Sequence, residues 1–336
     1  MNRRTGCGCV VAAALVAMAW GCGKPQEESR VDRSAISELA RKIDGSARRI
    51  ESRTRRLAES TAQTYLRADA IIAGVDTNQY REAAGGVYYK AVDDGGPALW
   101  VSGVVPVDDT IRRIAWATEG IDDELRAMLK ESPAVVQAYY NDRYSLNRIY
   151  PPFDVLSQYE PRMNIPEFNF YYLADASHNP ERKVVWVDEP YVDPAGRGWM
   201  VSCIAPVYVS NTLMGVVGLD VTVDGIVENF LQPEHRGWVL VDRKGTIVAA
   251  TETAIEHLRM PPLTDHRYIN TVRSDRYRSE DYNMLQSPSP DVRQLAAAVF
   301  GAEGVRSARL SGPGGNRLVL VEPVPALGWT ALLVVE

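Results

Sequence analysis

The stretch NFYYLADASHNPERKVVWVDEPYVDPAGRGWMVSCIAPVYVSNTLMGVVGLD, residues 169–220, decides the fold of this chain. Short apolar runs at 184–187, 200–207 and 213–221 alternate with turn-forming sequences at 193–196 (DPAG) and 209–211 (VSN). Apolar runs of this length between clusters of Gly, Pro, Asn and Asp are typical of β-strands. The stretch therefore predicts three antiparallel strands joined by short turns.

Aromatic side chains and carboxylates recur at the ends of these predicted strands. A concave site with aromatic walls and carboxylates offers both stacking and charge-assisted hydrogen bonds to a small polar ligand. The alternative is that the aromatic residues form core and the aspartates close turns, as Asp commonly does. The candidate ligand-binding residues are Tyr159, Asn169, Tyr171, Tyr172, Tyr191, Asp193 and Asp220.

The order of short motifs in this stretch resembles a known family. The motifs are Tyr-Tyr-x-Ala at 171–174, Pro-Tyr-x-Asp at 190–193, Trp-x-x-Ser at 199–202, Pro-Val-Tyr at 206–208 and Gly-Val-Val-Gly-x-Asp at 215–220. Together they resemble the membrane-distal module of double Cache (dCache, PDC or PAS-like) sensor domains. The sequences GWVLVDRKGTIV at 237–248 and GWTALLV at 328–334 are similar to the first and last strands of the membrane-proximal module of that family.

The N-terminus has the pattern of a secretory signal. Arg3 and Arg4 precede an apolar run at 10–20, which is too short to cross a bilayer and ends at Gly21-Cys22. A small residue directly before Cys resembles the lipobox of bacterial lipoproteins, in which the mature chain begins at a lipidated cysteine, here Cys22. Ordinary secretion with cleavage nearby is the alternative. Either way we expect an extracytoplasmic protein, and lipidation would anchor it to a membrane at the periplasmic or cell surface.

A long amphipathic helix is predicted after the signal. Between residues 31 and 73 there is no proline, and Ile36, Ile43, Ile50 and Leu57 recur every seven residues. The stripe is narrow and the other faces are charged. The helix therefore either lies along the rest of the chain or pairs with the same helix of a second copy. In the resembled family this helix forms a spine and often a dimer contact.

The resemblance implies an α/β (α+β) fold with a long N-terminal helix followed by two PAS-like modules with antiparallel sheets. We expect a boundary between the modules at Gln232-Pro233, after a helix at 223–230. The predicted division is a signal peptide at 1–21, a tether at 22–31, the long helix at 32–75, a first, membrane-distal and ligand-binding module at 76–231, and a second, membrane-proximal module at 232–336.

Composition and motifs exclude several classes of function. The chain carries a formal net charge of −6, which argues against nucleic acid as a partner. The four histidines show no metal-ligand spacing, and neither a Gly-x-Ser-x-Gly motif nor a phosphate-binding loop is present. We therefore expect no enzyme activity, no metal and no cofactor.

The charges of the predicted site suggest its ligand. Amino-acid-binding members of the resembled family bind the ligand carboxylate with an Arg and its ammonium with a distant Asp. In this sequence Asn169 stands where the Arg is expected, whereas the Asp is present as Asp220. An Asn cannot make the bidentate ionic contact of an Arg. An aromatic site with Asp220 and Asp193 favours an amine or amino-acid-like ligand, held by a salt bridge and cation–π contacts.

The sequence therefore predicts an extracytoplasmic sensor lipoprotein that binds a small molecule in its first module and signals through a separate membrane protein. The chain stops directly after its last predicted strand, so we expect no output domain of its own. The alternative is a ligand-independent docking or accessory lipoprotein for a membrane kinase, transporter or channel. The two differ in whether Tyr172, Tyr191 and Asp220 converge on a cavity.

Overall fold

A computed structural model describes residues 24–233, 235–261, 279–302, 304–312 and 315–335. The predicted signal peptide and Cys22 lie outside these residues. The first element, α1 (Lys24–Leu66), is longer at its start and shorter at its end than the helix predicted at 32–75, and α2 (Ala68–Ile72) follows it. The residues expected as a tether are therefore helical from Lys24 onward. Glu, Gln and Arg are good helix formers, and a proline such as Pro25 is tolerated in the first turn of a helix.

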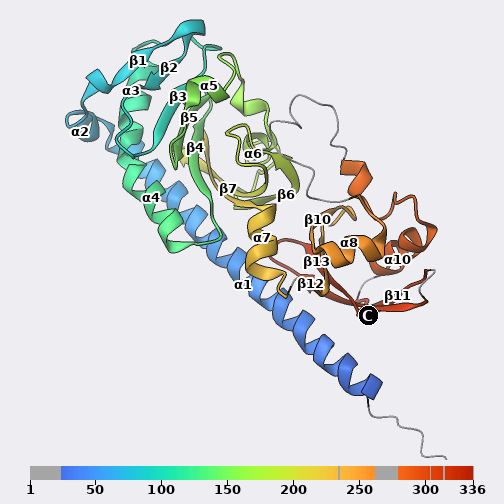
Figure 1. The fold of residues 1–336 in the computed structure, drawn as a ribbon. Coiled ribbons are helices and arrows are strands. Elements are labelled where there is room, and N and C mark those ends of the chain that lie inside the picture. The colour runs from blue at the N-terminus through green and yellow to red at the C-terminus, as the bar shows by residue number, and fades with distance from the viewer. Residues whose placement is uncertain (1–23, 234, 262–278, 303, 313–314, 336) are drawn as a thin grey trace, which may run out of the picture.

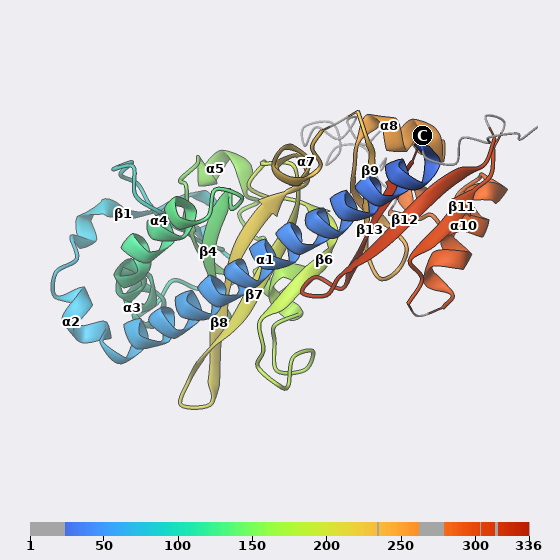
Figure 2. The same cartoon turned by 90° about the horizontal axis from the view of Figure 1, so that it is seen from below.

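The apolar stripe of α1 is buried within the chain. Ile36, Ile43, Ile50 and Leu57 are at most 4% exposed and belong to a core that includes strands of both modules. Figures 1 and 2 show α1 running along both modules. Of the two arrangements left open by the sequence, the structure has the helix lying along its own chain.

The first module is built on one eight-stranded sheet in which every pair of neighbouring strands is antiparallel. The three strands predicted at 184–221 are confirmed as β6, β7 and β8, at one side of the sheet. The order is β1-β2-β3-β5-β4-β8-β7-β6, with bounds β1 (Tyr80–Glu82), β2 (Tyr88–Lys90), β3 (Ala98–Val101), β4 (Gln137–Asp142), β5 (Leu146–Tyr150), β6 (Val185–Val192), β7 (Trp199–Val209) and β8 (Thr212–Thr222).

Helices and loops cover the two faces of this sheet. Alternate residues of a strand point to opposite faces, so each strand contributes to two separate cores. One core joins the sheet to α1, α3 and α4, and the other joins it to the segment that holds α5, η4 and α6. The helices are η1 (Thr77–Gln79), η2 (Ala84–Gly86), α3 (Asp109–Ala117), η3 (Thr118–Ile121), α4 (Asp122–Glu131), α5 (Val155–Gln158), η4 (Ile165–Glu167), α6 (Asn169–Tyr172) and α7 (Val223–Phe230).

The second module has a five-stranded antiparallel sheet covered by α8 and α10, as Figure 1 shows. Its central strands, β9 and β13, come from the two sequences at 237–248 and 328–334 that carry the family resemblance. The order is β10-β9-β13-β12-β11, with bounds β9 (Gly237–Val241), β10 (Ile247–Ala250), α8 (Glu252–Leu258), η6 (Ser279–Tyr282), α10 (Pro290–Phe300), β11 (Ser307–Leu310), β12 (Arg317–Val324) and β13 (Trp329–Val334).

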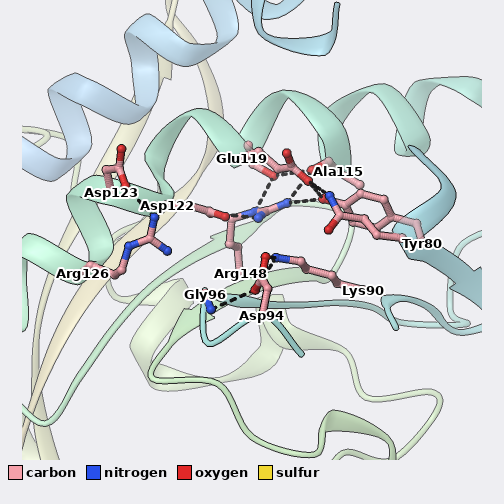
Figure 3. Close-up of polar contacts among 12 residues, drawn as sticks. Tyr80, Lys90, Asp94, Gly96, Ala115, Glu119, Asp122, Asp123, Arg126 and Arg148 are labelled. Atoms are coloured by element: carbon pink, nitrogen blue, oxygen red, sulfur yellow. Dashed lines mark hydrogen bonds and ion pairs between the residues drawn. The ribbon is translucent and has the colours of Figure 1, made fainter. Parts of the chain in front are cut away.

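A buried arginine ties the helices of the first module to its sheet. Arg148 on β5 is fully buried and donates to the Asp122 carboxylate (Nη1–Oδ1 2.8 Å) and to the Ala115 carbonyl (2.7 Å). It also donates to the hydroxyls of Thr118 (3.0 Å) and Tyr80 (3.1 Å). Figure 3 shows the guanidinium of Arg148 between Asp122, Ala115 and Tyr80. One side chain thus joins β5, β1 and the α3–η3–α4 segment.

Within the described residues, we find no helix that combines the length and the apolar character of a membrane span.

Candidate functional site

A small cavity lies on the face of the first sheet opposite α1, under the segment that holds η4 and α6. Its volume is about 20 Å³, room for about one water molecule. The described residues that line it are Gln137, Tyr139, Asn141, Asn147, Ile149, Tyr159, Met163, Ile165, Phe170, Tyr191, Asp193, Pro194 and Asp220.

Strand register brings the polar groups of this site together. Asp220 on β8 pairs directly with Gln137 on β4 and with Ser202 on β7. Directly opposed residues of antiparallel strands point to the same face, so the three side chains form one row across the central strands. The row is closed by Tyr191 from β6, whose hydroxyl lies 2.6 Å from that of Ser202.

Asp220 is fully buried, and its two oxygens have different partners. The hydroxyl of Ser202 lies 2.6 Å from Oδ1, and Nε2 of Gln137 donates to Oδ2 at 2.8 Å. Burial raises the pKa of Asp220 well above its usual range, and the nearby Asp193 carboxyl raises it further, while the two hydrogen bonds oppose the shift. An empty site therefore favours the protonated form of this carboxyl.

The second carboxyl, Asp193, is held by the turn between β6 and β7. Its oxygens accept from the backbone N–H of Ala195 (2.9 Å) and of Arg197 (3.1 Å), which is the behaviour expected of Asp in a turn. Burial raises the pKa of Asp193, and these backbone hydrogen bonds oppose the rise. Asp193 therefore both closes the turn and lines the cavity. Its structural role in the turn and its candidate role in ligand binding do not exclude each other.

Arg197 fastens the same turn to the rest of the sheet. Its guanidinium donates to the carbonyls of Val136 (2.9 Å) and Pro151 (2.8 Å), at the outer ends of β4 and β5. Burial lowers the pKa of Arg197, and the charges of Asp193 and Asp220 oppose this. In the sequence, Asn169 stands where the resembled family has the Arg that binds the ligand carboxylate. Arg197 lies near both carboxyl groups, but its guanidinium donates to backbone carbonyls and the residue does not line the cavity.

One acceptor in the cavity has no partner. Oε1 of Gln137 is buried and accepts no hydrogen bond from any described residue, while Nε2 of the same amide donates to Asp220. A buried amide oxygen left without a donor is costly. Together with the two carboxyl groups it makes the site rich in acceptors, which complements a ligand that donates hydrogen bonds.

Aromatic rings form the opposite wall. Phe170 of α6 lies 5.4 Å from the Tyr191 ring and 6.1 Å, edge to face, from the Tyr139 ring. Tyr159 packs edge to face on Trp100, with ring centroids 5.1 Å apart. The face of an aromatic ring attracts a cation, so an aromatic wall is compatible with a cationic ligand.

The two glycines of Gly-Val-Val-Gly make room for tyrosines on opposite faces of β8. A Cβ on Gly218 would stand 2.2 Å from ring atoms of Tyr139, and one on Gly215 would stand 2.7 Å from the Tyr140 ring. Because Gly218 has no side chain, the Tyr139 ring can lie across β8 beside the cavity.

Replacing Gly218 by alanine is expected to push the Tyr139 ring into the cavity, because β8 is fixed by pairing on both sides. Overpacking of this kind costs about 1–3 kcal/mol of unfolding free energy, and we expect ligand binding to be lost as well. Urea unfolding and calorimetric titration measure the two effects. Adding Tyr139→Leu should recover part of the stability; no recovery would show that the clash is not with this ring.

Four of the seven residues predicted for the site line the cavity, namely Tyr159, Tyr191, Asp193 and Asp220. The other three belong to α6 and do not line it. Tyr171 is buried, and Tyr172 packs on His178, with ring centroids 5.1 Å apart. Neighbouring residues of a helical turn point about 100° apart, so of this short helix only Phe170 faces the cavity. Asn169, which the sequence analysis includes among the candidate ligand-binding residues, is not among the residues that line this cavity.

Sequence reasoning missed the residues that come from the central strands. Gln137, Tyr139 and Asn141 alternate along β4, as do Asn147 and Ile149 along β5. The alternation was visible in the sequence, but nothing local assigned that face of β4 to the site rather than to the core. Of the described residues, no three of His, Cys, Asp and Glu come together as metal ligands.

No protein-family profile matches the sequence, and a search of curated proteins finds no significant relative. Solved structures do resemble this one. The ligand-binding domain of the Pseudomonas aeruginosa amino-acid chemoreceptor PctC, in complex with GABA, has a TM-score of 0.51 and 13% identity, covering 92% of this chain and 100% of that domain.

Two further structures have lower scores. The sensory domain of the Campylobacter jejuni chemoreceptor Tlp3, with isoleucine bound, has a TM-score of 0.48 at 13% identity, covering 93% of this chain and 95% of that one. The ligand-binding domain of the Pseudomonas fluorescens chemoreceptor CtaA, with L-serine, has a TM-score of 0.43 at 15% identity, covering 64% and 79%. From the match to PctC, the chain has the fold of a chemoreceptor ligand-binding domain of the double Cache type, with a long helix and two PAS-like modules.

Proposed function

We propose that this protein is an extracytoplasmic sensor that binds a small molecule carrying an ammonium group in its first module. The main support for the proposal is a group of hydrogen-bond acceptors that line one cavity. They are the carboxyls of Asp193 and Asp220 and the unpartnered Oε1 of Gln137. Its role is binding rather than catalysis. The ligand class is consistent with the GABA named for the PctC domain, which shares this fold.

The charges favour an ammonium over a carboxylate. A bound carboxylate would receive no hydrogen bond from Oε1 of Gln137 and would be repelled by an ionised carboxyl, whereas an ammonium donates three hydrogen bonds and favours the ionised forms of Asp193 and Asp220. Arg197 is a nearby cation, and its guanidinium donates hydrogen bonds to two backbone carbonyls. An amino acid would therefore bind through its ammonium, with its carboxylate toward the Arg197 side of the site.

A ligand larger than water requires the lining to move outward. The cavity of about 20 Å³ is far below the about 300–1,000 Å³ of ordinary ligand pockets. The turn at 193–198 would have to move in this expansion, because its residues Asp193 and Pro194 line the cavity. Binding would then shift β6 and β7 against α1, which contacts β7.

The ligand class is tested by a thermal-shift panel on the full-length protein in detergent, with primary and quaternary amines, amino acids and simple carboxylates. Ligand at 100 times its dissociation constant adds about 2.7 kcal/mol of stability. Shifts with amines or amino acids support the proposal. Shifts with carboxylates alone contradict the charge assignment, and no shift across the panel favours the docking role instead.

The affinity for an amine is expected to rise with pH. Burial raises the pKa of Asp220 in the empty site, and a bound ammonium would stabilise its ionised form, so binding releases a proton. Below the raised pKa the affinity should increase by up to about tenfold per pH unit. Calorimetry in two buffers of different ionisation enthalpy counts the protons released. An affinity that does not rise with pH would contradict an Asp220 that ionises on binding.

We also infer that the protein is a lipoprotein anchored through Cys22. The support is the arginine pair, the short apolar run and the small residue before this cysteine. Cys22→Ser is expected to abolish incorporation of labelled palmitate and to release the protein from membranes. Cys9→Ser, inside the predicted signal, is the matched control and should retain the label. Labelling that persists in Cys22→Ser would mean the anchor is elsewhere.

We further propose that the signal passes to a separate membrane protein. The long helix is the element best suited to carry it, since it contacts β7 and β8 of the first module and β12 and β13 of the second. A homodimer through α1 would have to use its polar faces, because the apolar stripe that suggested the dimer is buried within the chain.

A further inference from the structure

A second cavity, of about 300 Å³, lies in the second module, where α8 ends and α10 begins against the β11–β12 hairpin. Figure 1 shows these elements at the end of the molecule away from the first module's sheet. The lining side chains that carry the argument are Glu256, His257, Arg259, Ser289, Val292 and Arg317. This lining is basic and hydroxyl-rich, in contrast to the acceptor-rich site of the first module.

Arg317 enters the cavity from the first position of β12. Val319 and Val321 lie in the core beneath α8 and α10, and Arg317 shares their face because strand residues alternate. Its Nε is buried and donates to no described residue. A buried guanidinium N–H without an acceptor carries the full desolvation penalty of that group. A ligand oxygen that accepts from Nε would remove this penalty.

Arg259 comes from the C-terminal end of α8. It is the helix C-cap and has φ 50° and ψ 40°, a left-handed conformation that glycine adopts freely and other residues adopt at a cost. Its Nη2 lies 3.2 Å from the point where a Cβ on Gly312 would stand, so the side chain reaches across to the β11–β12 hairpin. Neither Arg259 nor Arg317 forms an ion pair with any residue that the structure describes.

The N-terminus of α10 faces the same cavity without a cap. Ser289 is its N-cap residue, yet the Ser289 side chain makes no capping hydrogen bond, and the next residue, Pro290, has no N–H. The N–H groups of Asp291 and Val292 therefore receive no side-chain acceptor, at the positive end of an eleven-residue helix. Backbone N–H groups of this kind bind anions.

Positive charge exceeds negative charge among the described lining residues. Glu256 is the one carboxylate there, set against two guanidinium groups; Asp291, in the first turn of α10, does not line the cavity. One singly charged anion would balance the lining. Planar guanidinium groups and helix N–H donors both match the oxygens of a carboxylate or a phosphate.

We propose that this cavity is a second ligand site, which binds a small oxyanion, the carboxylate or phosphate group of a small molecule, between Arg259, Arg317 and the start of α10. The site is independent of the ammonium site of the first module. The protein would then have one site for a cation and one for an anion.

The test is calorimetric titration of the full-length protein with inorganic phosphate and, separately, with acetate, at constant ionic strength. Saturable binding of either probe is expected, and the probe that binds identifies the source as a phosphate or a carboxylate. Arg317→Gln should lower the affinity at least about tenfold, as expected for loss of a charged hydrogen-bond donor. Arg309→Gln removes the same charge from an exposed position of β11 and should leave the affinity within about twofold.

Arg259→Gly separates binding from folding. Glycine relieves the left-handed conformation, so this variant should unfold at the same or a higher temperature while losing anion binding. Asp220→Asn should leave phosphate or acetate binding unchanged, so failure of the ammonium proposal would not affect this one. No saturable binding of either probe, or equal losses in Arg317→Gln and Arg309→Gln, would overturn the second site.

Discussion

Replacing Arg148 by methionine is expected to lower the free energy of unfolding by about 3–5 kcal/mol, the usual cost of breaking a buried ion pair by removing one partner. The guanidinium is fully buried and holds four groups from three parts of the first module. Its loss leaves the Asp122 carboxyl without its ion pair, and burial already raises the pKa of that carboxyl. Urea unfolding followed by tryptophan fluorescence measures the change.

Arg126→Met is the matched control for this prediction. Arg126 pairs with Asp123 at the surface, where an ion pair contributes about 0–1 kcal/mol, and Figure 3 shows it beside the Arg148 cluster. Adding Asp122→Leu to Arg148→Met should recover part of the loss, because no unpaired carboxyl then remains. A loss below about 1 kcal/mol in Arg148→Met would mean that the cluster does not hold the helices to the sheet.

Replacing Asp220 by asparagine is expected to weaken the binding of an amine about 100-fold. The change keeps the size of the side chain and its acceptor toward Ser202, but it removes the charge opposite the ammonium. A hydrogen bond to a charged partner contributes about 1.5–3 kcal/mol, and 1.4 kcal/mol corresponds to tenfold in affinity. Because burial raises the pKa of Asp220 and disfavours its ionised form, the variant should be at least as stable as the natural protein when the site is empty.

Asp224→Asn is the control for the charge itself. Asp224 lies in the first turn of α7, exposed, so its replacement changes net charge by the same amount outside the cavity. We expect its affinity for the amine to be unchanged. Equal weakening in both variants would attribute the effect to overall charge, and unfolding of Asp220→Asn would make Asp220 a structural residue.

The strands and helices of the central stretch could be predicted from the sequence because local signals define them. Alternating apolar runs and turn residues mark β6, β7 and β8, and the helix at 223–230 is α7 with the same bounds. The seven-residue stripe of α1 also predicted a long helix. Which surface covers that stripe could not be predicted, because a narrow apolar face fits either a sheet or a second helix.

The candidate site was harder to predict than the fold. Asp193 and Asp220 carry a local signal, since they follow or end apolar strands in motifs of fixed spacing. Gln137 does not: its place beside Asp220 depends on the pairing of β4 with β8, two strands more than 70 residues apart in sequence. Asn169 lies outside the cavity lining for a related reason, because a one-residue shift in a short helix decides which side chain faces the cavity.

The most direct test of an ammonium site in the first module compares two ligands that differ only at the charged group. The best-binding amine from the panel and the alcohol that has a hydroxyl in place of its ammonium are titrated calorimetrically into the full-length protein. We expect the amine to bind at least about tenfold more tightly, because only the ammonium gains from Asp193 and Asp220. Equal affinities, or tighter binding of the alcohol, would contradict an ammonium site in the first module.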